Sequence, residues 1–277
     1  MADKWRMLDR YRILREIGHG AMGTVFEAID GASGERVAVK ILKKSLQANS
    51  VARQRFRREV EAASRIDHPV IIKIREWGED AEQTYIVMEY VDGQPLSKLL
   101  SPIAPFPLVN TVRIVHQVAG GLASVHRAGL VHRDIKPDNI MVLKDAAVKL
   151  SDFGVAKIPD SALTQAGELW GTLNYMSPEQ VQGRLDINGK SDIFSLGVVL
   201  FEMLTCKRPF GDGLDATLIR RIIENPAPRV TTLKPGIPEV FDFIVARALA
   251  KDPADRFVSC DEFAQALKSA MPFLRLG

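Results

Sequence analysis

"HRDIKPDN", residues 132–139, gathers a His, an Arg, two Asp, a Lys and an Asn around Pro137. One interpretation is a solvated polar turn, because Pro and Asp are ordinary turn residues. The neighbouring sequence favours another interpretation. The stretch lies between "VHRAGLV" (125–131) and the apolar run "IMVL" (140–143), which are both expected to be buried. A polar loop held between buried segments is a common place for chemistry.

The residue types in this loop suit phosphate chemistry. Asp134 can accept a proton, Lys136 can hold a phosphate oxygen, and Asn139 can ligate a metal ion. On its own the stretch is only suggestive, so the rest of the chain has to decide.

Composition predicts a globular protein with a large core. The chain has 277 residues, of which 46% are hydrophobic and 26% charged, and this length favours two subdomains. The net charge of +3 is small, and most basic residues are dispersed. The sequence therefore predicts no nucleic-acid partner.

The cysteines and apolar runs bear on location. Cys206 and Cys260 lie far apart, without metal-ligand spacing, which favours a reduced, cytoplasmic setting. The first ten residues contain no apolar signal region, and "LGVVLF" (196–201) is too short to span a bilayer. We expect no membrane segment in this chain, which is either cytoplasmic or the cytoplasmic domain of a longer, membrane-anchored protein.

Periodicity divides the chain into a β-rich part and a helical part. Short β-branched and aromatic runs predict strands at 11–18, 24–30, 36–42, 71–79 and 84–91. Apolar spacing predicts helices at 50–66, 108–129, 190–210, 239–252 and 259–271. Gly129 is a C-terminal stop signal, and Asp192 suits the positive end of a helix dipole. The pattern thus predicts a small β-rich lobe, a linker at 91–95 and a larger helical lobe, with a ligand cleft between them.

The stretch "IGHGAMGTV" (17–25) spaces Gly18, Gly20 and Gly23 as in phosphate-binding loops. Glycine lets backbone N–H groups approach phosphate oxygens closely. A Rossmann fingerprint would run into a helix, whereas a strand follows here. The stretch is therefore either a hairpin lid over phosphates or a plain glycine-rich turn.

Two more charged residues follow strand-like runs. Lys40 ends "VAVK" and is either a snorkelling surface residue or a buried cation, for which Glu59 on the next helix is the obvious partner. Asp152 stands in "SDFG" (151–154), directly after the run "AVKL". Neither motif is informative in isolation.

Together, in this order and spacing, the motifs "GHGAMGTV", "VAVK", "HRDIKPDN", "DFG" and "SPE" (177–179) resemble those of the protein kinase family. The resemblance extends from about Tyr11 to Met271. Within the family, "RFRREVEAASRIDHPVI", "YIVMEYVDGQPL" and "YMSPEQ" are most similar to bacterial serine/threonine kinases of eukaryotic type.

This resemblance implies an α+β, bilobal kinase fold. The N-lobe, residues 11–91, would be a small antiparallel sheet with one helix that binds ATP. The C-lobe, residues 92–272, would be mainly helical and carry the catalytic loop, the activation segment and the substrate platform. The implied cofactors are ATP and Mg²⁺, with Mn²⁺ as a substitute metal, and the implied partners are protein substrates.

The resemblance also assigns roles in phosphoryl transfer. Asp134 would accept or orient the substrate hydroxyl proton, and Lys136 would contact the γ-phosphate. Asn139 and Asp152 would hold Mg²⁺. Lys40 would clamp the α- and β-phosphates and be held by Glu59. The remaining nucleotide contacts would come from Ile17, Gly18, Gly20, Gly23, Val25, Ala38, Met88, Glu89, Val91 and Met141.

Other matching positions are expected to be structural or regulatory. His132 would pack against Phe153. Glu179 and Arg256 would form a buried ion pair, and Asp192 would brace the catalytic loop.

Arg133 would await a phosphate in the segment between Asp152 and Glu179. Among the hydroxyl residues there, Thr164 is the predicted phosphosite. Thr172 and two later residues lie in the substrate platform, Ser161 lies close to Pro159, and the Thr164–Thr172 spacing resembles that of bacterial relatives.

Two functional alternatives remain. A pseudokinase would keep the fold as a nucleotide-binding or scaffolding module, although Lys40, Asp134, Asn139 and Asp152 are all present. A small-molecule phosphotransferase is disfavoured by the "SPE" segment. Lys136 and Thr172 favour Ser/Thr over Tyr as the acceptor. A homodimer for autophosphorylation is an option, since bacterial relatives commonly dimerise.

Overall fold

The computed structural model describes residues 7–20, 23–43, 50–80, 83–101, 104–152, 173–213 and 216–275. These residues form two compact units. The first contains residues 7–67 and 71–92, and the second contains 68–70 and the chain from 93 onward, with the gaps given above. The predicted lobe boundary, between residues 91 and 92, lies one residue from this division.

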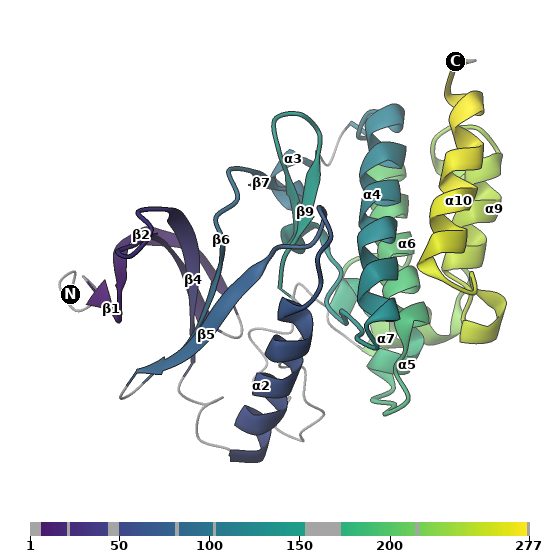
Figure 1. The fold of residues 1–277 in the computed structure, drawn as a ribbon. Helices are drawn as coiled ribbons and strands as arrows, with labels where there is room; N and C mark the ends of the chain where they lie inside the picture. Colours follow the sequence, from purple (N-terminus) through teal and green to yellow (C-terminus); the bar gives the residue numbers. More distant parts are fainter. Residues whose placement is uncertain are drawn as a thin grey trace. The chain divides into compact units, whose positions relative to one another are not determined.

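The first unit is built on a six-stranded sheet with the order β1-β2-β3-β4-β6-β5 (Figure 1). All of its pairings are antiparallel. The strands are β1 (Met7–Leu8), β2 (Tyr11–Gly20), β3 (Gly23–Asp30), β4 (Arg36–Leu42), β5 (Ile74–Asp80) and β6 (Gln83–Glu89). The five predicted strands are present, but the fourth begins at Ile74 rather than Ile71.

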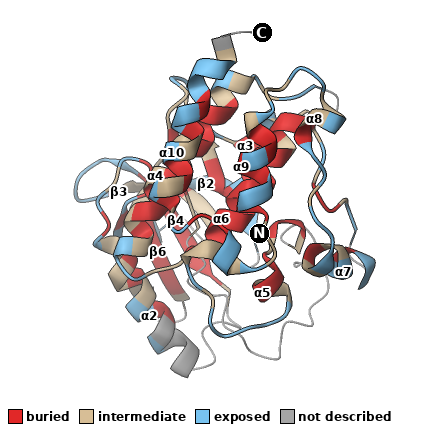
Figure 2. Cartoon of the chain, turned by 90° about the vertical axis from the view of Figure 1, so that its right-hand side faces the viewer, coloured by how far each residue is buried: buried red, intermediate tan, exposed pale blue. Residues whose placement is uncertain are grey.

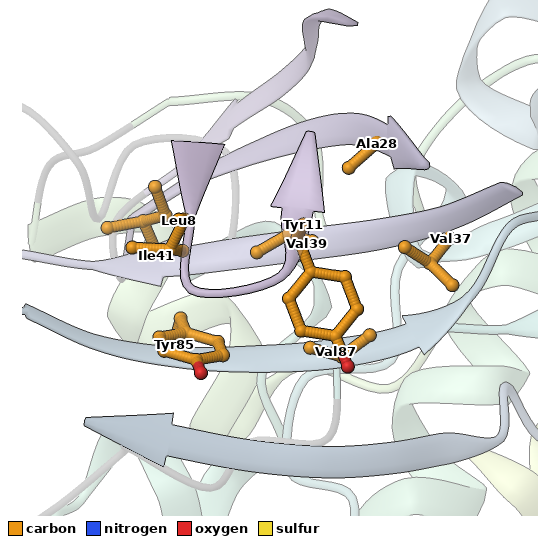
Figure 3. Close-up of a cluster of buried hydrophobic side chains, with 8 residues drawn as sticks. All are labelled: Leu8, Tyr11, Ala28, Val37, Val39, Ile41, Tyr85 and Val87. Atoms are coloured by element: carbon orange, nitrogen blue, oxygen red, sulfur yellow. The ribbon is translucent and has the colours of Figure 1, made fainter. Parts of the chain in front are cut away.

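One face of this sheet carries a buried apolar cluster (Figure 3). Strands alternate their side chains between two faces, and Val37, Val39 and Ile41 of β4 lie on one of them. Tyr11 and Tyr85 pack there edge to face, with ring centroids 6.3 Å apart. The β1–β2 hairpin adds Leu8, which is 3% exposed.

Among its described residues, this unit has one long helix, α2 (Ser50–Ser64), which packs against β5. Phe56, Val60 and Ala63 are buried, as the predicted spacing requires. The helix ends two residues before the predicted end at Ile66.

The second unit is mainly helical. A small antiparallel sheet contains β7 (Gln94–Pro95), β8 (Ile140–Val142) and β9 (Val148–Leu150). The α-helices are α3 (Leu96–Leu99), α4 (Leu108–Arg127), α5 (Pro178–Val181), α6 (Gly189–Thr205), α7 (Ala216–Glu224), α8 (Val230–Leu233), α9 (Val240–Ala248) and α10 (Cys260–Ala270). Short 3₁₀ helices are η1 (Pro137–Asn139), η2 (Leu173–Tyr175), η3 (Pro253–Asp255) and η4 (Met271–Arg275). Nowhere in the described part of the chain is a helix both long and apolar enough to cross a bilayer.

Helix α6 forms the centre of this unit. Every residue from Ser191 to Phe201 is buried, and Figure 2 shows the helix as buried along most of its length. It contacts α4, α9 and α10. A helix that is apolar all round is expected in the interior of a domain, and the burial of α6 agrees with its composition.

Helices α4 and α6 end where the backbone turns into the left-handed conformation, rather than where the apolar spacing of the sequence stops. Gly129 has φ +74 after the end of α4, as predicted for a stop glycine. The helix predicted at 190–210 ends at Thr205, because Cys206 adopts the left-handed conformation with φ 60. Helix α7 was not predicted, although Leu218 and Ile222 form a buried i, i+4 pair.

Close packing of α6 leads to a stability prediction. A Cβ atom on Gly197 would lie 2.8 Å from Cβ of Ala248 on α9. Gly197→Ala should therefore lower the free energy of unfolding by about 1–3 kcal/mol, the usual cost of overpacking. Thermal unfolding followed by circular dichroism measures the effect.

Gly120→Ala is the matched control. Gly120 lies within α4, and a Cβ there would meet no atom within 4 Å. Alanine should stabilise the helix at this position by about 0.4–1 kcal/mol. If both variants shift Tm in the same direction, close α6–α9 contact is not the cause.

Candidate active site

The stretch at 132–139 is a buried loop rather than a solvated turn. His132, Asp134 and Asn139 are 0%, 8% and 4% exposed. The loop precedes β8, and its last three residues form η1. The interpretation as an ordinary surface turn is therefore wrong.

Asp134 lies at the centre of the loop's polar contacts. Its Oδ2 atom accepts a hydrogen bond of 3.0 Å from Nδ2 of Asn139 and lies 3.1 Å from Nζ of Lys136. Nδ2 of Asn139 also donates to the Asp134 carbonyl at 2.7 Å. The structure thus brings together three residues that were predicted to act together.

These contacts orient Asn139. Its amide nitrogen is directed at the carboxylate and the carbonyl of Asp134. Its backbone carbonyl accepts from the Ser151 N–H at 2.9 Å, which places the neighbouring Asp152 close to the loop. Amide and carboxylate oxygens are the ligands that Mg²⁺ prefers. The side-chain chemistry of Asn139 and Asp152 suits a divalent metal ion, and their role as its ligands stays a prediction.

Asp152 has an unusual backbone for a non-glycine residue, with φ 55. Such left-handed residues cost about 1–3 kcal/mol and cluster at functional sites. Asp152 lies two residues after the end of β9, so a short strand restricts its position.

His132 has a structural environment. Its Nδ1 atom accepts the Asp134 N–H at 3.3 Å, so Nε2 carries the hydrogen donated to the Ser151 carbonyl at 3.0 Å. Burial lowers the pKa of His132, although the nearby Asp192 carboxylate opposes the shift. The ring is therefore neutral near pH 7 and acts as a spacer between the loop and the end of β9. Its predicted contact with Phe153 lies outside the described residues.

Asp192 supports the loop from α6. Its carboxylate accepts the backbone N–H groups of His132 at 2.9 Å and Arg133 at 2.8 Å. It also contacts Nε2 of His126 on α4 at 2.7 Å. The prediction that Asp192 braces this loop is confirmed, and these direct contacts replace the helix-dipole explanation. The contribution of His126 was not predicted.

Gln180 is a second residue that the sequence analysis missed. Its Nε2 atom donates to the Arg133 carbonyl at 2.9 Å. The sequence offered only a cap pattern at Ser177 and Gln180, which predicts a local bond and not this contact.

The predicted buried ion pair between Glu179 and Arg256 is confirmed. Two parallel bonds of 2.7 and 2.8 Å join the guanidinium and the carboxylate. Burial acts to raise the pKa of Glu179, but the Arg256 hydrogen bonds outweigh it and the pKa is lowered. This paired carboxylate therefore remains ionised at neutral pH and holds the start of α5.

The other predicted phosphate contacts lie in the first unit. Lys40 is on β4 and is 7% exposed, so it is not a snorkelling surface lysine. Val25 and Ile86 flank it on the neighbouring strands. Glu59 lies on α2 and is half-buried. Their pairing stays a prediction.

Strand register aligns several predicted nucleotide contacts. Ala38 pairs with Met88, and Gly18 pairs with Val25, which pairs in turn with Lys40. Glu89 ends β6, where its carboxylate accepts the Lys73 N–H at 2.8 Å. Ile17 lies in β2, Val91 follows β6, and Met141 belongs to β8 of the second unit. Their contacts with a nucleotide remain predictions.

The three glycines of the 17–25 stretch differ in environment. A Cβ on Gly23 would lie only 2.0 Å from the Ile41 carbonyl oxygen of β4. Gly23 is thus required by strand packing, whereas a Cβ on Gly20 would meet nothing within 4 Å. For Gly18 and Gly20, the main reason for a glycine is still the predicted close approach of a phosphate group to the backbone. Thr164, Thr172 and Gly154 lie outside the described residues.

Comparisons with known proteins agree with these observations. The family described as "Protein kinase domain" matches residues 11–269. The probable serine/threonine-protein kinase PknB of Lactococcus lactis is 36% identical over 272 residues, covering 97% of this chain and 43% of that protein. PknA of Mycobacterium tuberculosis, a serine/threonine-protein kinase, is 39% identical over 265 residues, covering 93% of this chain and 60% of PknA.

A crystal structure of the Mycobacterium tuberculosis PknI kinase domain superposes with a TM-score of 0.75 and 30% identity. The match covers 95% of this chain and 97% of that domain. The chain therefore spans about half the length of the curated relatives and nearly all of a kinase domain.

The contacts of Asp192 lead to a second prediction. Asp192→Asn keeps the side-chain shape but directs an amide N–H₂ at a backbone N–H, which leaves a buried donor without an acceptor. We expect a loss of about 3 kcal/mol in the free energy of unfolding, measured by urea denaturation.

Asp261→Asn controls for the change of charge. Asp261 pairs with Arg127 at 3.0 Å, and both side chains are more than 60% exposed. Such pairs contribute at most about 1 kcal/mol. Equal destabilisation by the two substitutions would contradict the bracing role of Asp192.

Proposed function

This chain belongs to the protein kinase family, and from that premise we propose that it transfers the γ-phosphoryl group of ATP to serine and threonine hydroxyls of proteins. The observation that carries the proposal is the cluster of buried Asp134 and Asn139 with half-buried Lys136, on a loop held by Asp192. Phosphoryl transfer depends mainly on positioning and charge neutralisation, and this cluster supplies both.

The residues of the loop have distinct roles in this reaction. Asp134 accepts the proton as the substrate oxygen bonds to phosphorus and the bond between phosphorus and the departing ADP oxygen breaks. Lys136, 3.1 Å from Asp134, is placed to neutralise the moving phosphoryl group. A metal ion held by Asn139 and Asp152 would neutralise phosphate charge. We propose Mg²⁺ as that ion, with Mn²⁺ as a substitute.

The first unit would serve as the ATP-binding lobe. The burial of Lys40 supports a role as phosphate clamp held by Glu59, because a buried ammonium needs anionic partners. Ala38, Val25 and Met88 would contact the adenine ring, and the backbone near Glu89 and Val91 would bind its edge. Gly18 and Gly20 would cover the phosphates.

We further propose that the domain acts on protein substrates in the cytoplasm. Cys206 and Cys260 are both free, which suits a reducing compartment. A homodimer for autophosphorylation remains part of this proposal.

A direct test is incubation of the purified protein with Mg-ATP and a generic protein substrate, followed by phosphoamino-acid analysis. We expect phosphoserine and phosphothreonine. Asp152→Asn and Lys40→Met should each lower kcat by at least about 100-fold, since both groups act on the charge that develops during transfer.

Asp145→Asn and Lys144→Met repeat these substitutions at exposed positions of the β8–β9 turn and should leave kcat within twofold of wild type. No transfer by the wild-type protein would favour the pseudokinase alternative. Predominant phosphotyrosine would refute the acceptor assignment.

Thr164 is our proposed activating phosphosite. Two other hydroxyl candidates of this segment are buried and already bonded, which makes them poor phosphosites. Tyr175 is 5% exposed and donates to Glu202, and Ser177 is 0% exposed and caps α5. Phosphate at Thr164 would add about −1.5 to −2 charge for Arg133 to bind.

Thr164→Ala should lower activity towards an added protein substrate, whereas Ser161→Ala should not. Peptide mapping of the wild-type protein after incubation with Mg-ATP should find phosphate on Thr164. A fully active enzyme that is unmodified at this residue would exclude the switch.

A further inference from the structure

Gln180 uses both ends of its side-chain amide. Its Oε1 atom accepts from the N–H of Ser177 at 3.0 Å and from the Ser177 hydroxyl at 3.2 Å. Its Nε2 atom donates to the Arg133 carbonyl at 2.9 Å. One planar group thus joins the start of α5 to a loop 47 residues earlier in the sequence.

The residue that Gln180 holds is conformationally costly. Arg133 has φ 64, a left-handed conformation that L-residues rarely adopt. Its N–H is bound by Asp192 at 2.8 Å, and its carbonyl is bound by Gln180. Both peptide groups of this strained residue are therefore fixed by side chains from other elements.

The peptide group held by Gln180 is the one that joins Arg133 to Asp134. A rotation of that peptide would change the direction of the Asp134 carboxylate. Misplacement of a reacting group by about 1 Å can cost about 100-fold in rate. The contact therefore bears directly on the proposed proton acceptor.

We infer that Gln180 is a positioning residue that couples the peptide platform at the start of α5 to the orientation of Asp134. The inference rests on the proposed kinase function. It predicts that the "SPE" platform and the catalytic loop are adjusted together, because one amide group binds both.

A purely local role for Gln180 has to be separated from this coupling. Ser177 and Gln180 form a capping box on α5, and that motif accepts Glu as well as Gln. Glu at position 180 keeps the acceptor for Ser177 but loses the donor for the Arg133 carbonyl. Gln180→Glu thus preserves the cap and removes the coupling.

The experiment compares Gln180→Glu with Gln182→Glu, an exposed position at the end of the same helix. For Gln180→Glu we expect Tm within about 2 °C of wild type, because Glu in the first turn also suits the helix dipole. We expect KM for ATP within twofold, and kcat for protein phosphorylation lowered about 10- to 100-fold. Gln182→Glu should match wild type in all three.

Hydrogen–deuterium exchange of the 133 and 134 amides, measured without nucleotide, provides a readout independent of activity. Gln180→Glu should accelerate this exchange, and Gln182→Glu should not. Gln180→Lys does the opposite. Its ammonium group can donate to the Arg133 carbonyl, but it cannot accept the Ser177 N–H, so the capping box on α5 is lost. It should retain more of the kcat than Gln180→Glu while Tm falls.

The inference is overturned if Gln180→Glu keeps kcat within twofold of wild type. It is also overturned if kcat falls while loop exchange stays unchanged, because added charge alone would then explain the loss. Absence of activity in the wild-type protein would refute the proposed function instead, and the exchange comparison would still decide whether Gln180 holds the loop.

Discussion

A buried carboxylate that must have hydrogen-bond donors determines the geometry of the loop at 132–139. Asp192 is 1% exposed within α6, a helix whose residues 191–201 are all buried, where an unsolvated charge is costly. The N–H groups of His132 and Arg133 satisfy it. The same bonds hold Arg133 in its left-handed conformation. The hydrogen-bond donors that the Asp192 carboxylate requires therefore determine the backbone conformation of Arg133.

The first turn of α6 extends this principle to the start of α5. Next to Asp192, the Ser191 hydroxyl donates to Glu179, and the Lys190 carbonyl accepts from Arg256 at 2.9 Å. Three consecutive residues thus support the loop at 132–139 and the start of α5. Both segments are anchored to one rigid helix, and Gln180 connects them directly. Such preorganisation is what phosphoryl transfer requires of a protein.

The sequence predicted the parts of this arrangement that depend on local pattern. The strand pattern placed Lys40 at the end of an apolar strand but left its burial open, the motifs predicted that Asp134 and Asn139 act together, and the family resemblance predicted that Asp192 braces their loop. It could not predict the partner of Gln180, because a side chain's contact with a distant carbonyl depends on tertiary packing. The end of α6 before Cys206 was not predicted either, because no local sequence signal indicated it. Cysteine has no intrinsic preference for the left-handed conformation that it adopts there.

The N-terminal hairpin has a practical consequence for the choice of domain limits. The family match begins at residue 11, yet the apolar cluster of the first unit already includes Leu8, and Asp9 accepts the Tyr85 hydroxyl at 3.2 Å. A protein shortened to begin at residue 11 would lose Leu8 from this cluster and leave apolar side chains such as Ile41, which lies beside Leu8 in Figure 3, more exposed. Contiguous exposed apolar surface promotes self-association. Solubility on expression would therefore be set by residues upstream of the recognisable domain.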